Sequence, residues 1–129
     1  MSHGHLNEGA FPFLEIARYG REGTFEMALT FTTNRSVFLR RYIVFQLEGF
    51  YRTNPAKVSN ALQGALKDSD GIVCLYALTV TSRLGLTNSM PAVANLTNSP
   101  EPPIRKRAAE TLRDLQNAEN KRKRVSPEY

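Results

Sequence analysis

The sequence contains few of the residues on which enzymes, metal sites and disulfide-bonded scaffolds depend. Its 129 residues include one cysteine, two histidines and no tryptophan. Because a single cysteine cannot form an internal disulfide or a structural zinc site of several cysteines, disulfide-rich secreted scaffolds are excluded. Cys74 lies in an apolar run, so we expect a buried thiol in a reducing, intracellular compartment. His3 and His5 both lie near the N-terminus, and we expect no catalytic triad that includes histidine.

Long apolar runs and glycine-rich loops are also absent. No segment has the roughly 20 apolar residues of a membrane-spanning helix, and the N-terminal MSHGHLNEGAFPF lacks the charged and apolar regions of a signal peptide. The segment Gly20-Arg21-Glu22-Gly23 lacks the lysine of a phosphate-binding loop. We therefore expect a protein without enzymatic activity, metal or cofactor. It is expected in the cytoplasm, or in the nucleus if the host is a eukaryote, and not in a membrane.

Basic side chains exceed acidic ones and give a net charge of +5. The excess is concentrated in residues 35–68, with six basic and two acidic side chains, and in residues 101–129, with eight basic and five acidic ones. A negatively charged partner would be attracted to these regions rather than to residues 1–34, where acidic side chains are in excess. A solvated surface is the simpler explanation of so mild an excess, and a binding patch is the alternative.

Three segments carry apolar residues, with one threonine among them, at the spacing i, i+4, i+8 and i+11 of a single helix face. In the last segment these residues are Ile104, Ala108, Leu112 and Leu115; 31 residues earlier they are Val73, Ala77, Thr81 and Leu84, and a further 34 residues earlier they are Leu39, Ile43, Leu47 and Phe50. Turn and cap residues precede each segment, as in Asn34-Arg35-Ser36 and Asp68-Ser69-Asp70-Gly71. Such a recurrence is typical of helical-repeat proteins.

Four shorter helices are predicted in addition, at residues 11–19, 24–33, 57–67 and 89–97. The segment 24–33 is also compatible with a strand, because Thr30, Thr32 and Thr33 are β-branched. Its apolar residues keep helical spacing, so we predict a helix there. The prediction is an all-α chain of about seven helices, with residues 1–10 as a flexible N-terminus and residues 117–129 as a disordered basic tail.

The pattern of an apolar residue, arginine, two further residues and two alanines, which Ile104 to Ala109 carries, resembles the short HEAT-like repeats of bacterial helical-repeat proteins. The resemblance extends over about residues 24–116, although Ile43-Val44 and Cys74 depart from the pattern in the first two repeats. It implies a short α-solenoid of about three helix pairs in residues 11–116, which serves as an adaptor, inhibitor or assembly factor. It also implies that Arg40 braces a loop carboxylate of the next repeat, such as Asp70.

Two groups of residues are candidates for binding a partner. The first interleaves basic and aromatic side chains, a mixture that suits a phosphate backbone or an acidic protein surface. The second is a run of four cations in the tail. The candidates are Arg35, Arg40, Arg41, Tyr42, Tyr51, Arg52 and Lys57, and in the tail Lys121, Arg122, Lys123 and Arg124. We expect Arg41 and Arg52 to be freer for binding than Arg40. A protein is the expected partner, and nucleic acid is the alternative.

Overall fold

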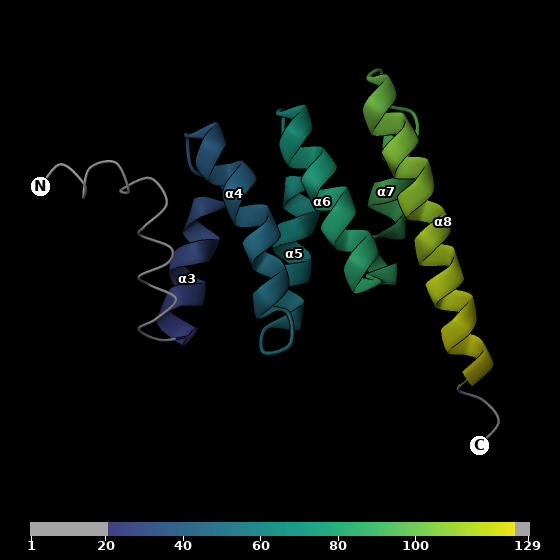
Figure 1. Cartoon of the computed structure of the whole chain (residues 1–129), viewed down its shortest axis with the longest axis horizontal. Helices are drawn as coiled ribbons and strands as arrows, with labels where there is room; N and C mark the ends of the chain where they lie inside the picture. The colour runs from purple at the N-terminus through teal and green to yellow at the C-terminus, as the bar shows by residue number, and fades with distance from the viewer. Residues whose placement is uncertain (1–20, 126–129) are drawn as a thin grey trace, which may run out of the picture.

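The structure is a computed structural model that describes residues 21–125, and within this range every regular element is a helix (Figure 1). The α-helices are α3 (Arg21–Phe31), α4 (Val37–Leu47), α5 (Pro55–Ala65), α6 (Gly71–Leu84), α7 (Met90–Leu96) and α8 (Pro102–Val125), and the short 3-10 helices are η1 (Glu48–Phe50) and η2 (Thr87–Ser89). The predicted all-α class is therefore confirmed for residues 21–125. The segment that was also compatible with a strand is helix α3, whereas the helix predicted at 11–19 lies outside the described residues.

The same turn precedes α4, α6 and α8. In each case a backbone N–H donates to a side-chain oxygen two residues earlier, and the bonds run from Ser36 to Asn34 Oδ1 (2.8 Å), from Asp70 to Asp68 Oδ1 (2.8 Å) and from Glu101 to Ser99 Oγ (3.1 Å). The side chains of Ser36 and Asp70 then accept the N–H of Leu39 and Val73, and so they satisfy amides of the first helical turn. The three helix starts are thus built alike, at the spacings of 34 and 31 residues that the sequence pattern predicts.

The core lies between the helices on the predicted faces. Helix α6 packs against both α4 and α8, and Figure 1 shows these three helices side by side, with α5 and α7 behind them. Of the residues at the predicted core positions, Ile43, Leu47, Val73, Ala77, Thr81, Ile104, Ala108 and Leu115 are buried, whereas Leu39, Phe50, Leu84 and Leu112 are half-buried. The apolar spacing in the sequence therefore identified the buried face of each long helix.

Helix α8 is longer than predicted. The sequence pattern placed its end near residue 116, and residues 117–129 were expected to be disordered, but the helix continues to Val125. Glu119 forms ion pairs with Arg122 and Lys123, at the i+3 and i+4 spacings that stabilise a helix. The expectation of disorder is therefore wrong for residues 117–125, and residues 126–129 lie outside the described range.

Gly85 ends α6 in a left-handed conformation, with φ 65° and ψ 41°. A Cβ atom added at Gly85 would meet the Cβ of Ala118 at 3.9 Å, which is an ordinary contact, so the backbone alone disfavours a larger residue. We expect Gly85→Ala to lower the free energy of unfolding by about 1–2 kcal/mol, the cost of a left-handed residue that has a side chain. Urea denaturation measures this change. Gly85→Asn should cost less, and equal losses would contradict the backbone explanation.

Candidate binding surfaces

Two arginines of α4 are bonded to the turn before α6. Arg40 donates from Nε to Asp68 Oδ2 (2.8 Å) and from Nη2 to Asp68 Oδ1 (3.2 Å). Arg41 donates from Nε and Nη2 to the two carboxylate oxygens of Asp70, each at 3.0 Å. Both pairs are bidentate, which is the geometry that fixes the direction of an arginine side chain most firmly. Together they connect α4 to the start of α6.

The protonation of these groups reflects the same contacts. The hydrogen bond to Asp68 raises the pKa of Arg40, and the hydrogen bond to Asp70 raises the pKa of Arg41. The hydrogen bond from Arg41, aided by the N–H of Val73, lowers the pKa of Asp70 despite its partial burial. Arg40, Arg41 and Asp70 therefore keep their charges at neutral pH.

The pairing differs from the expected one in two respects. Arg40 does brace a loop carboxylate, but its partner is Asp68 rather than Asp70. Arg41, expected to be free for a partner, holds Asp70 instead. The reason is that the turn presents two carboxylates two residues apart, so that two consecutive arginines on α4 each reach one. The presence of two aspartates, Asp68 and Asp70, was the feature of the sequence that indicated a second arginine–carboxylate pair.

The other candidates near α4 do not form one patch. Arg35 and Arg52 are exposed, but they lie before α4 and after η1, and therefore at opposite ends of this helix. Lys57 pairs with Glu26 of α3 at 3.3 Å. Tyr42 is half-buried beside Ile43 and packs inward instead of facing a partner. The expected interleaved patch of basic and aromatic side chains is thus dispersed over several surfaces.

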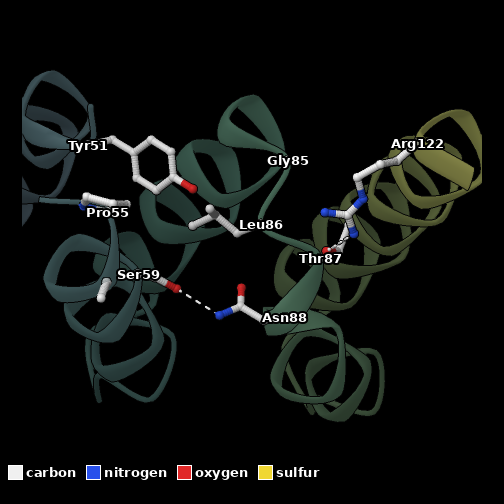
Figure 2. A pocket seen from close by; sticks show the side chains of 9 residues that line it. Tyr51, Pro55, Ser59, Gly85, Leu86, Thr87, Asn88 and Arg122 are labelled. Atoms are coloured by element: carbon white, nitrogen blue, oxygen red, sulfur yellow. Dashed lines mark hydrogen bonds between the residues drawn. The ribbon is translucent and has the colours of Figure 1, made fainter. Parts of the chain in front are cut away.

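Two of the remaining candidates line a cavity of about 410 Å³ between α5, the end of α6 and α8 (Figure 2). Tyr51 and Leu86 lie on one side of it, and Arg122 lies on the other side, where it donates to Thr87 Oγ1 at 3.0 Å. Lys121, Lys123 and Arg124 are exposed along the last turns of α8. Two candidates that are far apart in the sequence, Tyr51 and Arg122, therefore line one cavity.

An exposed apolar surface, which was not predicted from the sequence, spans α4 and α6. Phe38 is 72% exposed, and Phe45 and Ile72 are each 37% exposed. The Phe45 ring lies 4.6 Å from the ring of Tyr76, measured between centroids, and this contact joins the two helices. Phe38 lies two turns before Phe45 on α4, and Ile72 lies one turn before Tyr76 on α6. Helix geometry therefore places each pair on one face of its helix, and the contact between Phe45 and Tyr76 brings the two faces together. We call these four residues the apolar face.

Basic groups border the apolar face. The Arg41 guanidinium carbon lies 5.6 Å from the centroid of the Phe38 ring. Towards α8, a shallow cavity of about 240 Å³ is lined by Leu75, Pro103 and Lys106, among others. Lys106 is exposed and has no carboxylate partner among residues 21–125. The spacing of Phe38 and Phe45, outside the predicted core positions, was the signal in the sequence for this surface.

The cysteine and the metal-binding side chain types of the described residues form no exposed cluster. Cys74 is buried, as predicted; its Sγ donates to the carbonyl oxygen of Leu66 at 3.4 Å, and burial raises its pKa to about 11, so the thiol is protonated at neutral pH. Residues 21–125 contain no group of histidine, cysteine and carboxylate side chains able to hold a metal ion. No helix in this range is long and apolar enough to cross a membrane.

Comparison with models of known protein families finds no match. Searches among curated proteins and among solved structures find none either. The function is therefore inferred from the geometry of residues 21–125.

Proposed function

We propose that the chain is a non-enzymatic interaction module that binds a partner protein through the apolar face. The observation that carries this proposal is the 72% exposure of Phe38, on a surface shared with Phe45, Ile72 and Tyr76. A soluble domain that leaves large aromatic side chains in water gives up burial energy, and such patches typically mark interaction sites. Aromatic side chains are also the commonest anchors of protein interfaces.

A short stack of three HEAT-like helix pairs is part of this proposal. The pairs are α3 with α4, α5 with α6, and α7 with α8. The repeated turn before α4, α6 and α8 supports such a stack, as does the packing of α6 against both neighbours. In this arrangement α4, α6 and α8 form a continuous surface on one side, which suits a long partner segment.

The partner segment that fits this surface is amphipathic. Its apolar side chains would cover Phe38 and Ile72, and an acidic side chain near Leu75 would meet Lys106, which has no carboxylate of its own within residues 21–125. Charge complementarity of this kind adds specificity and association rate more than affinity. The net charge of +5 also favours an acidic partner.

Exchange of Phe38 tests the proposal. The variant Phe38→Glu should fold normally, because the side chain is already exposed, and should bind the partner at least about tenfold more weakly, since a truncated interface anchor costs more than about 1–2 kcal/mol. The matched control is Met27→Glu on α3, where the side chain is 43% exposed. Proteins retained from the native host's lysate by the wild type are quantified with both variants, and binding of each is then measured with the purified partner.

Several outcomes would contradict the proposal. Equal binding by Phe38→Glu and the wild type would show that the apolar face is not used, and equal loss in Met27→Glu would indicate a general effect of charge. Phe38-dependent self-association in sedimentation would identify a second copy of the chain as the occupant. Treatment of the lysate with nuclease separates proteins that are retained directly from those bridged by nucleic acid.

Nucleic acid is the second candidate partner, and the exposed cations at the end of α8 favour it. Against it, Arg40, Arg41 and Lys57 are already paired with carboxylates. Binding that weakens steeply as salt rises, and that Lys123→Gln with Arg124→Gln reduces, would support this candidate. Binding through the apolar face should change little with salt.

A further inference from the structure

Two consecutive arginines of α4 bind the turn that precedes α6. Arg40 and Arg41 hold the carboxylates of Asp68 and Asp70, which flank Ser69 in the turn before α6. Arg40 is itself fixed, because its Nη1 also donates to the carbonyl oxygen of Asn34, six residues earlier, at 2.8 Å. This backbone contact restrains the guanidinium in addition to its bonds with the carboxylate.

Helix α8 repeats this arrangement. The recurrence that aligns Leu39 with Ile104 places Arg105 and Lys106 at the positions of the two α4 arginines. Arg105 Nη1 donates to the carbonyl oxygen of Ser99, also six residues earlier, at 2.9 Å. Arg105, which corresponds to Arg40, is therefore held in the same way, by the backbone of the turn before its own helix.

The pair on α8 has no carboxylate to bind within the described residues. Arg105 and Lys106 are both exposed, and neither forms an ion pair among residues 21–125. The next turn of the two helices differs in burial. Val44 of α4 is buried, whereas Ala109, the equivalent residue on α8, is exposed. Within residues 21–125 this side of α8 is thus open, and its small side chain allows close approach.

We propose that Arg105 and Lys106 bind the acidic turn at the start of a helix in a partner protein, with two carboxylates spaced as in Asp68-x-Asp70. A second copy of the chain fits less well. Its own Asp68 and Asp70 are already paired, and its turn before α4 contains Asn34, Arg35 and Ser36, which bring a positive charge and no carboxylate. Lys106 also borders the surface proposed for the partner segment, but the site needs none of the four residues of the apolar face.

The probe for this site is a synthetic peptide with the sequence of residues 64–80, in which Cys74→Ser prevents oxidation. Because isolated peptides of this length are marginally helical, a second form carries a side-chain lactam that stabilises the helix after the turn. Each peptide is titrated into the isotope-labelled full chain at low salt. We expect saturable NMR shifts centred on the Arg105 side-chain Nε–H and on the amide of Lys106.

Matched variants separate this site from general attraction. We expect the dissociation constant to rise at least about tenfold in the protein variant Arg105→Gln/Lys106→Gln, and equally in the peptide variant Asp68→Asn/Asp70→Asn, the loss typical of charge-assisted hydrogen bonds. The control Arg113→Gln/Lys121→Gln removes the same charge elsewhere on α8 and should change the constant less than about twofold. Phe38→Glu should bind the peptide as the wild type does.

Three results would overturn the proposal. The first is the absence of saturable shifts at Arg105 and Lys106 with both peptide forms. The second is equal weakening by the control variant, which would mean that the net charge of α8 attracts the peptide. The third is a set of shifts at these residues that depends on protein concentration without peptide, which would identify a second copy as the occupant.

Discussion

Replacement of Leu62 by alanine should lower the free energy of unfolding by about 2–5 kcal/mol. Leu62 is completely buried on α5 and belongs to the main core cluster, together with Val58 and Leu78. Loss of its side chain removes apolar contacts and leaves a cavity that the surrounding helices can fill only in part. Urea denaturation followed by far-ultraviolet circular dichroism measures the change.

A second leucine provides the control. Leu112 is half-buried at the edge of the same cluster on α8, so Leu112→Ala should cost clearly less than Leu62→Ala. If both variants lose the same stability, the assigned difference in burial is wrong. If neither variant loses stability, α5 and α8 do not pack as described.

Replacement of Asp70 should have the second largest effect on stability. Its carboxylate both accepts the N–H of Val73 at the start of α6 and binds Arg41 from α4. Loss of an N-terminal cap alone costs about 0.5–2 kcal/mol, and Asp70→Ala also leaves a guanidinium without its partner. The control is Asp114→Ala, at an exposed carboxylate on α8 that accepts a hydrogen bond from Ser82. A smaller loss in Asp70→Ala than in Asp114→Ala would contradict the double role.

The pH dependence tests the same contact. Because Arg41 lowers the pKa of Asp70 in the folded state, the contribution of Asp70 is fully present above the pKa of an unfolded aspartate, about 3.9. It is lost as the pH falls from there through the lower folded-state pKa. We expect Asp70→Asn to flatten the fall in stability below about pH 4. An unchanged slope in chemical denaturation across this range would show that the ion pair does not form.

The helices and their buried faces were predictable because they depend on residues that are close in the sequence. Ser36 and Asp70 cap helices through amides three residues later. Burial of residues such as Ile43 and Leu115 follows from a spacing that any helix imposes on its side chains. The end of α8 was predicted too early, because the prediction relied on apolar spacing. The last turns of this helix have no such spacing and are stabilised instead by the ion pairs of Glu119.

The binding surfaces were less predictable, because they are made by residues that only packing brings together. The sequence alone determined the all-α class, the helix starts and the core faces, since these follow from local spacing and capping. The tertiary structure decided that Arg41 is occupied by Asp70 and that Tyr51 and Arg122 share a cavity. It also decided that Phe38 stays in water. These contacts depend on how neighbouring helices cross and on which side of each helix remains uncovered, and neither is encoded within a single helix.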